Sequence, residues 1–349
     1  MSASSEQFMR RAVELSRGGY PAPNPRVGCV VVKDGSIVGE GHHDHAGGPH
    51  AEVVALSAAG KSARGADLYC TLEPCNHHGR TPPCTDAIIE SGIARVLFAV
   101  SDPNPCAKGG AERLDEAGVG CESGLLASEA AEVNTVFLTA MNRSRPYVVV
   151  KVATTSDGFI AKLDGTSKWI TGTEARDAGY RLRAELGCVL VGRKTVELDD
   201  PQLTARVEGV VNQPLRVVLD PQASLTEEKT VFSDGGSTLR VVAPGKCEWG
   251  RDVEIAYQNG FDLQALLDVL FTRGVAGVLV EGGGETIASF LKSELVDRVE
   301  KFVAPISFGE GRHWLGANPP EMAMEELSRG NLGEDLHITY RVVSPKTGT

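Results

Sequence analysis

The sequence has no long hydrophobic run and few positive charges. No stretch approaches the ~18 apolar residues of a membrane span, and its start (MSASSEQFMRRAVELS) lacks the apolar region of a signal peptide. Lysine and arginine total 35 against 46 acidic residues, a net charge of -11 with a pI near 5.3. We therefore expect a cytoplasmic protein that binds neither membranes nor nucleic acid in general. A few local arginines can still hold one phosphate of a small molecule.

Cysteine is also sparse for a disulfide-stabilised protein. Eight cysteines occur in 349 residues, and two of them stand in a metal-like pattern, so we expect reduced thiols. Hydrophobic residues make up 42% of the chain and charged residues 23%, which is typical of a globular protein. The length exceeds that of one typical domain, so two are expected.

Helical and strand patterns alternate along the first half. We expect helices at 5–18, 50–59, 85–91, 111–117 and 129–141, and strands at 27–33, 37–40, 66–71, 96–100 and 119–122. Helices that alternate with buried strands indicate a layered α/β domain. The polar segment 142–146 breaks this pattern, and we place the domain boundary there, with one domain at 1–144 and a second at 145–349.

The second half repeats the α/β pattern. We expect strands at 147–153, 188–191, 215–219, 239–242 and 277–280, and helices at 174–186, 263–273 and 286–292. Segments 205–213 and 221–236 are polar and contain glycine, so we expect surface loops there.

His50, Cys75 and Cys84 are candidate zinc ligands, and Glu52 follows the first of them by two residues. One imidazole and two thiolates leave a fourth tetrahedral position for water, as in catalytic zinc sites. His-x-Glu followed by Pro-Cys is typical of zinc deaminases. Zinc would lower the pKa of its water toward ~7, and Glu52 would take that proton and deliver it to ammonia. We therefore expect hydrolytic removal of an amino group from a heterocycle.

Two other interpretations of these residues stay open. A structural zinc site would take a fourth ligand from the neighbouring histidines, which are His42, His43, His45, His77 and His78. Glu52 would have no purpose there. The cysteines could also be buried without a metal. The spacing between Cys75 and Cys84 is longer than the Cys-x-x-Cys of the general deaminase pattern.

Four segments closely resemble the deaminase half of the bifunctional riboflavin-biosynthesis enzymes. They are 23–28 (PNPRVG), 48–52 (GPHAE), 71–84 (TLEPCNHHGRTPPC) and 102–105 (DPNP). That family joins a diaminohydroxyphosphoribosylaminopyrimidine deaminase to a 5-amino-6-(5-phosphoribosylamino)uracil reductase. The resemblance runs from about residue 6 to about residue 340. It implies a cytidine-deaminase-like three-layer domain.

In that domain the resemblance implies one zinc ion on His50, Cys75 and Cys84, with Glu52 as the proton carrier. It also implies contacts to the pyrimidine, ribose or phosphate of the substrate from four residues, which are Asn24, His43, His77 and Arg80. Each of these four could equally be a polar residue that stabilises a loop.

A glycine-rich turn stands in the second half. Residues 278–286 (VLVEGGGET) indicate a strand, a turn and a helix start, where backbone N–H groups can approach a pyrophosphate. The Gly-x-Gly-x-x-Gly spacing is missing, so an ordinary turn is an equally good interpretation from these residues alone.

Segments 151–158 (KVATTSDG), 167–171 (SKWIT) and 192–206 (GRKTVELDDPQLTAR) resemble the family's reductase half. The resemblance implies a dihydrofolate-reductase-like α/β domain that uses NADPH, with Lys151 at the floor of its site. The implied cofactor contacts are Ala153, Trp169, Thr195, Asp199, Gly283, Gly284, Glu285, Thr286, Ile287, Ala288 and Ser289. The implied substrate contacts are Ser167, Arg183, Leu203, Arg206 and Glu281.

Several roles in this half have open alternatives. Arg183 and Arg206 suit a phosphate because a planar guanidinium binds it at two points, but Arg183 could also lie on a solvated helix face. Trp169 could stack on nicotinamide or belong to the core. Arg193 and Lys194 could contact the 2′-phosphate of NADPH or simply be solvated.

The sequence thus predicts a bifunctional hydrolase and NADPH oxidoreductase. It would deaminate 2,5-diamino-6-(5-phosphoribosylamino)pyrimidin-4-one and then reduce ribosyl to ribityl, giving 5-amino-6-(5-phosphoribitylamino)uracil. Hydride would reach C1′ through the ring-opened imine, with Lys151 or Asp199 assisting proton movement. The family resemblance also implies assembly into a homo-oligomer.

Two further hypotheses remain at this point. One is a cytidine- or tRNA-type zinc deaminase whose second half is accessory, against which the Cys spacing and the acidic balance count. The other is a zinc-stabilised binding module that senses a nucleotide.

Overall fold

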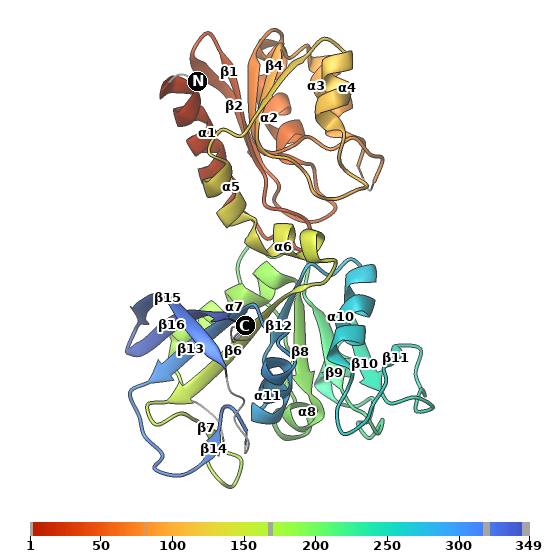
Figure 1. Cartoon of the computed structure of the whole chain (residues 1–349), viewed down its shortest axis with the longest axis vertical. Helices are drawn as coiled ribbons and strands as arrows, with labels where there is room; N and C mark the ends of the chain where they lie inside the picture. Colours follow the sequence, from red (N-terminus) through yellow and green to blue (C-terminus); the bar gives the residue numbers. More distant parts are fainter. Residues whose placement is uncertain (1–2, 80, 167–169, 317–321, 344–349) are drawn as a thin grey trace, which may run out of the picture. The chain divides into compact units, whose positions relative to one another are not determined.

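Two α/β units make up the chain in the computed structural model, which describes residues 3–79, 81–166, 170–316 and 322–343. The first unit is Met1–Arg143 with Gly209–Asn212, and the second is Ser144–Glu208 with Gln213–Thr349 (Figure 1). No helix within the described ranges is long and apolar enough to cross a membrane.

The first unit is built on a five-stranded sheet in the order β2-β1-β3-β4-β5. The strands are β1 (Gly28–Lys33), β2 (Ser36–His42), β3 (Asp67–Leu72), β4 (Arg95–Val100) and β5 (Gly120–Ser123). The helices are α1 (Ala3–Leu15), α2 (Ala51–Ala59), α3 (Cys84–Ser91), α4 (Gly110–Glu116), α5 (Ala127–Val133) and α6 (Thr135–Arg143), with a 3-10 turn, η1, at Gly60–Ala63. β1 is antiparallel to both of its neighbours, whereas β3, β4 and β5 are parallel.

Helices cover both faces of this sheet because successive strand residues point to opposite sides. On one face Cys70 and Phe98 pack among residues of α2, α3 and α4. On the other face Tyr69 and Leu97 pack against Met9 of α1 and against α5. Figure 1 shows α1 and α5 on one side of the strands and α3 and α4 on the other. The predicted three-layer arrangement is confirmed.

The second unit has a nine-stranded sheet in the order β11-β10-β9-β8-β12-β6-β13-β16-β15. The strands are β6 (Tyr147–Thr155), β8 (Cys188–Gly192), β9 (Leu215–Leu219), β10 (Thr238–Val242), β11 (Asp252–Glu254), β12 (Gly277–Val280), β13 (Arg298–Ala304), β15 (Ala323–Leu332) and β16 (Asp335–Val343), and β7 (Phe159–Ala161) pairs separately with β14 (Arg312–His313). The helices are α7 (Thr173–Leu186), α8 (Arg193–Asp199), α9 (Thr230–Ser233), α10 (Leu263–Thr272) and α11 (Gly284–Lys292).

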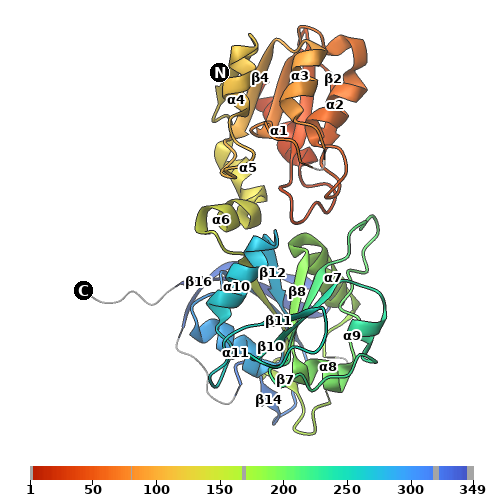
Figure 2. The same ribbon diagram turned by 90° about the vertical axis from the view of Figure 1, so that its right-hand side faces the viewer.

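The strands from β11 to β13 are parallel, and β16 is antiparallel to both of its neighbours, β13 and β15. α10 and α11 pack on one face of the sheet, where Leu267 and Phe290 join the largest hydrophobic cluster. α8 and α9 lie on the other face (Figure 2), where Val196 and Phe232 join a second cluster. β12 lies between β6 and β8, so the carboxyl ends of these three strands are adjacent.

Two expectations about local structure are wrong. The single helix predicted at 129–141 is two helices, α5 and α6, because Asn134 between them exchanges 2.8 Å hydrogen bonds with the backbone N–H and C=O of Arg26. The loop predicted at 221–236 contains the short helix α9. Its first residue, Thr230, donates from its backbone N–H and its hydroxyl to the Asp200 carboxylate at 2.9 and 2.8 Å. Both exceptions depend on contacts distant in sequence.

A buried ion pair secures the start of the second unit. Both terminal nitrogens of Arg145 donate to the Asp297 carboxylate at 2.8 Å, and the side chains are 13% and 7% exposed. Asp297 also accepts the backbone N–H of Val148 in β6 at 2.8 Å. The carboxylate therefore satisfies a buried cation and a strand donor together.

Replacing Asp297 by alanine should destabilise the second unit by about 3–5 kcal/mol, because Arg145 would keep its buried charge without a partner. All three tryptophans lie after residue 145, so urea unfolding followed by tryptophan fluorescence reports on this unit. Glu326→Ala, which breaks the exposed pair with Arg329, is the control and should leave the midpoint in place. Equal midpoints for the two variants would contradict this prediction.

Candidate functional site

The three candidate metal ligands meet at the carboxyl end of β3. His50 precedes α2, Cys75 follows β3, and Cys84 is the first residue of α3. His50 Nδ1 lies 3.2 Å from Cys84 Sγ and 3.5 Å from Cys75 Sγ, and the three ligand atoms lie within 4.8 Å of one another. Both cysteines are buried. The structure therefore brings together an imidazole and two thiols in one small cluster.

This cluster fits a zinc ion. Zinc bonds of about 2.3 Å to sulfur and 2.0 Å to nitrogen at tetrahedral angles place the ligand atoms about 3.5–3.8 Å apart. The distances from His50 Nδ1 to the two sulfurs come close to that spacing. An imidazole with two thiolates is also a donor set that zinc prefers.

The protonation of the cluster suits metal binding. The pKa of Cys75 is lowered, first by the hydrogen bond from the Cys84 thiol and then by His50, and the Cys84 backbone N–H donates to its sulfur at 3.4 Å. The pKa of Cys84 is raised because its thiol donates to Cys75 and is buried. One thiolate is thus stabilised in the free protein, and a metal would displace the remaining protons.

Glu52 and Thr81 complete this centre. Glu52 lies in the first turn of α2 and is only 4% exposed, and burial raises the pKa of its carboxyl group. Thr81 Oγ1 lies 3.4 Å from His50 Nε2 and can accept its proton, which leaves Nδ1 free to face the thiols. Sequence reasoning missed Thr81, although it stands inside the Gly-Arg-Thr-Pro-Pro segment between the two cysteines.

Asn24 and His43 form a pair beside the cluster. His43 Nδ1 lies 3.0 Å from the Pro49 carbonyl and must donate to it, so Nε2 accepts from Asn24 Nδ2 at 3.0 Å. Burial lowers the pKa of His43, which favours this neutral form. The His43 and His50 rings lie 5.1 Å apart, edge to face.

Two further predicted substrate contacts lie in the segment before Cys84. His77 is half-buried, and its Nδ1 has no hydrogen-bond partner among the described residues. Arg80 lies outside the described residues.

Glu73 holds the loop next to the cysteines. Its carboxylate accepts the backbone N–H of Asp102 at 3.2 Å and that of Ala111 at 3.1 Å. A Cβ atom on Gly110 would come within 1.8 Å of the Pro74 carbonyl oxygen, so only glycine allows this close approach. These contacts connect the ends of the parallel strands β3 and β4.

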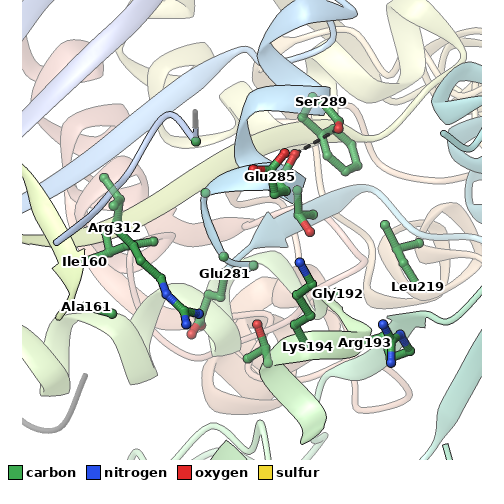
Figure 3. A pocket seen from close by; sticks show the side chains of 18 of the residues that line it. Ile160, Ala161, Gly192, Arg193, Lys194, Leu219, Glu281, Glu285, Ser289 and Arg312 are labelled. Atoms are coloured by element: carbon green, nitrogen blue, oxygen red, sulfur yellow. Dashed lines mark hydrogen bonds between the residues drawn. The ribbon is translucent and has the colours of Figure 1, made fainter. Parts of the chain in front are cut away.

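A cavity of about 1390 Å³ lies at the carboxyl ends of β6, β8, β9 and β12 in the second unit (Figure 3). Pockets for small ligands usually measure about 300–1,000 Å³, so this one has room for a dinucleotide and a substrate. Open α/β sheets bind ligands at this edge.

The glycine-rich turn after β12 fits a pyrophosphate. A Cβ atom on Gly284 would lie 2.7 Å from the His313 carbonyl oxygen, so the turn needs glycine to pass this backbone. A Cβ atom on Gly283 would meet nothing within 4 Å, and Gly283 lines the cavity. The turn therefore offers accessible backbone ahead of α11, as a cofactor pyrophosphate requires.

A buried group of charges lies at the other end of the cavity. Arg183 Nε and Nη2 donate to Glu281 at 2.7 and 2.8 Å, and Arg183 Nη1 donates to the Thr204 carbonyl at 3.0 Å. Burial lowers the pKa of Lys151, while Glu281 opposes that shift. Burial alone would raise the pKa of Glu281, but Arg183 outweighs it and the pKa is lowered. The Arg183 side chain is 14% exposed, so it does not lie on a solvated helix face.

The structure brings most of the predicted reductase residues to this cavity. Those that line it are Lys151, Ala153, Arg183, Thr195, Asp199, Glu281, Gly283, Gly284, Glu285, Thr286 and Ser289. The Ser289 hydroxyl donates to the Glu285 carbonyl at 2.8 Å (Figure 3).

The other predicted residues that the structure describes are not among those that line the cavity. Ile287 and Ala288 are buried outside the cavity lining, because a helix turns part of any continuous run toward the core. Leu203 is 3% exposed and packs in the cluster with α8 and α9, outside the cavity lining. Arg206 is exposed beside the cavity and donates to the Tyr180 hydroxyl at 3.4 Å. Ser167 and Trp169 lie outside the described residues.

Sequence reasoning missed several residues of this cavity. Arg176 and Tyr180 of α7 line it, and the Tyr180 ring lies within 5.5 Å of both the Arg183 and Arg206 guanidiniums. The spacing of residues 176, 180 and 183 along one helix face could have indicated them. His313 also lines the cavity, and no sequence signal marked it.

Comparisons with known proteins agree with this architecture. The family model described as "RibD C-terminal domain" matches residues 146–338, and "Cytidine and deoxycytidylate deaminase zinc-binding region" matches residues 2–100. The riboflavin biosynthesis protein RibD of Aquifex aeolicus is 44% identical over 96% of this chain and 98% of its own length. RibD of Escherichia coli is 39% identical over 95% of this chain and 96% of its own length.

Solved structures are similar over the same length. Acinetobacter baumannii RibD covers 98% of this chain and 99% of its own, with a TM-score of 0.88 and 35% identity. A deaminase/reductase from Thermotoga maritima covers 97% of this chain and 99% of its own, with a TM-score of 0.84 and 38% identity. The predicted fold class is confirmed, with a cytidine-deaminase-like unit followed by a dihydrofolate-reductase-like unit.

Cys84→Ser should reduce bound zinc from one ion per chain to near zero, because a neutral hydroxyl replaces a buried thiolate ligand. Inductively coupled plasma analysis of the dialysed protein measures this. Cys106→Ser changes an exposed thiol outside the cluster and should keep the full zinc content. Full zinc in Cys84→Ser would show that the ion is held elsewhere.

Proposed function

Because the chain belongs to the RibD family of riboflavin-biosynthesis proteins, we propose that residues 1–144 carry out its deamination and residues 145–349 its reduction. The chain is a bifunctional deaminase and NADPH-dependent reductase of riboflavin biosynthesis. A cytidine- or tRNA-type deaminase with an accessory second half is not favoured, because a reductase family model accounts for residues 146–338.

The proposed substrate of the first unit is 2,5-diamino-6-(5-phosphoribosylamino)pyrimidin-4-one. Zinc, when bound to His50, Cys75 and Cys84, supplies a Lewis acid that makes water nucleophilic near neutral pH. Glu52 accepts a proton from the attacking water and returns it to the departing ammonia. Asn24 and His43 lie beside the cluster, where their fixed hydrogen-bonding pattern can orient the pyrimidine.

The second unit then reduces the ribosyl group of the deaminated product to ribityl. NADPH, when bound, supplies the hydride for C1′. Lys151 and Asp199 both line the cavity, and one of them provides the proton that accompanies reduction. Glu281 holds Arg183 in a fixed orientation beside Lys151, so the polar end of the cavity is preorganised for the phosphorylated sugar.

The observation that carries the proposal is the presence of both sites on one chain. A His-Cys-Cys cluster with a buried glutamate lies in one unit, and a cavity with a glycine-rich turn lies in the other. The test is a coupled assay with the diaminopyrimidine ribotide, in which ammonia release and NADPH oxidation are followed separately and zinc is measured in the same sample. Ammonia from cytidine but none from the ribotide would contradict the proposed substrate.

We also propose that the enzyme works in the cytoplasm as a homo-oligomer. All eight cysteines are free, which supports a reducing compartment. Light scattering coupled to size-exclusion chromatography measures the subunit number.

Glu52→Gln should lower the rate of deamination about 10²–10⁴-fold while zinc stays bound, because the amide cannot carry the proton. Ammonia release and metal content are measured on the same preparation. Glu90→Gln changes an exposed glutamate of the same unit and should retain full activity. Retained turnover in Glu52→Gln would remove Glu52 from the mechanism.

Lys151→Ala and Asp199→Asn should each impair NADPH oxidation with the deaminated substrate. Replacing the residue that donates the essential proton should lower the rate of reduction about 10²-fold or more. Ammonia release should be unchanged in both. Lys292→Ala and Asp177→Asn are the matched controls, since both residues are exposed outside the cavity lining. If neither Lys151→Ala nor Asp199→Asn slows reduction, neither residue supplies the proton.

A further inference from the structure

We propose that Tyr257 and Lys194 form the adenosine end of the reductase cofactor site, where Tyr257 stacks on the adenine ring and Lys194 binds the 2′-phosphate that distinguishes NADPH from NADH. This inference rests on the reductase function proposed above. It names two side chains whose types suit the two chemical features of an adenosine 2′-phosphate.

The order of the strands sets the direction of a bound dinucleotide. Lys151 belongs to β6, the glycine-rich turn follows β12, Gly192 ends β8 and Leu219 ends β9. These strands are neighbours in that order, so the row spans three spacings, or about 14 Å. Lys151, one of the two candidate proton donors, lies at the β6 end, and the glycines suited to a pyrophosphate lie in the middle, after β12. Adenosine is therefore directed to the β9 end.

The β9 end of the cavity is apolar and carries an exposed aromatic ring. Leu219, Pro221, Tyr257 and Phe261 line it. Tyr257 is 37% exposed, although large apolar surfaces are usually buried. Adenine is a flat ring that stacks well on such a side chain, and stacking of this kind is worth about 1–3 kcal/mol per base.

A tight turn holds the Tyr257 ring in place. Tyr257 and Phe261 face each other across an antiparallel bridge, and the Gln258 backbone N–H donates to the Gly260 carbonyl at 3.0 Å. The Tyr257 and Phe261 rings meet at 5.0 Å and 68°, and Phe261 packs against the hydrophobic core. Asn259 at the tip of the turn also lines the cavity and offers an amide to the polar edge of a base. The platform is therefore preorganised.

Lys194 is the cation best placed for a 2′-phosphate. It is exposed, follows β8 next to β9, and forms no ion pair within the part of the chain that the structure describes. Its neighbour Arg193 is paired with Glu197. Figure 3 shows Arg193 toward Leu219 and Lys194 between Arg193 and Glu281.

The other cations of the cavity are less suitable. Arg183 is neutralised by Glu281 at the polar end. Arg312 donates to the Leu163 carbonyl at 3.3 Å, and Figure 3 shows it beside Ala161, away from Leu219. Arg176 of α7 donates to the Thr171 carbonyl at 3.0 Å.

The test titrates the zinc-loaded full-length protein with fragments of the cofactor in a calorimeter. The probes are NADP⁺, adenosine 2′,5′-bisphosphate, 5′-AMP and nicotinamide mononucleotide. Tyr257→Ala should weaken binding of NADP⁺ and both adenosine fragments about fivefold or more, and Tyr257→Phe should not. Lys194→Gln should weaken only the two ligands with a 2′-phosphate and reduce the salt dependence of their binding. Neither change should affect the nicotinamide fragment.

Lys292→Gln is the matched control for loss of one exposed positive charge outside the cavity. Tryptophan fluorescence reports whether the Tyr257→Ala variant folds. If it does not, Tyr257→Leu replaces it, because leucine keeps an apolar contact to Phe261. Tyr257→Leu should weaken binding of the same three ligands. Unchanged adenosine 2′,5′-bisphosphate affinity in Tyr257→Ala and Tyr257→Leu or in Lys194→Gln, or equal losses for all four probes, would overturn the inference. If the unmodified protein binds NADP⁺ but the variants behave as it does, only this inference fails. If it binds no NADP⁺, the proposed reductase function fails with it.

Discussion

Parallel strands end at one edge of a sheet, and both sites of this protein depend on that constraint. In the first unit β3 and β4 end side by side, and Glu73 ties the chain after β4 to the segment that carries Cys75. In the second unit β6, β12 and β8 end together, which places Lys151, Glu281 and Gly192 around one cavity. Residues that are far apart in sequence become neighbours because their strands are aligned.

An ion pair and a set of hydrogen bonds hold candidate functional side chains of the two units in place. Arg183 and Glu281 satisfy each other at the polar end of the reductase cavity, which Lys151 also lines. An unpaired guanidinium at that depth would cost several kcal/mol. In the first unit His43 is neutral and bonded to Asn24 and to a carbonyl, so its orientation is set without a charge. Pairing thus preorganises both sites before any ligand arrives.

Most helices and buried strands before residue 293 could be predicted from hydrophobic periodicity, because each buries one face against a sheet. The helix α8 and the later strands β13, β15 and β16 were not predicted. Two wrong predictions were decided by contacts between residues distant in sequence. Asn134 divides one expected helix because its amide bonds to the backbone at Arg26. Thr230 starts a helix inside an expected loop because Asp200 accepts its donors. At the candidate sites, Leu203 could be placed on the substrate only by resemblance, and packing buries it in the core.

The sequence by itself determined the chemistry available to this protein. His50, Glu52, Cys75 and Cys84 are specific enough in type and spacing to indicate a zinc deaminase, and the glycines at 282–284 allow a backbone to approach a phosphate. Only the tertiary structure decided which groups meet. Thr81 reaches His50, Tyr180 lies between two guanidiniums, and Tyr257 lines the far end of a cavity that begins at Lys151. Local patterns cannot specify such contacts, because they arise when strands distant in sequence pair and bring their ends together.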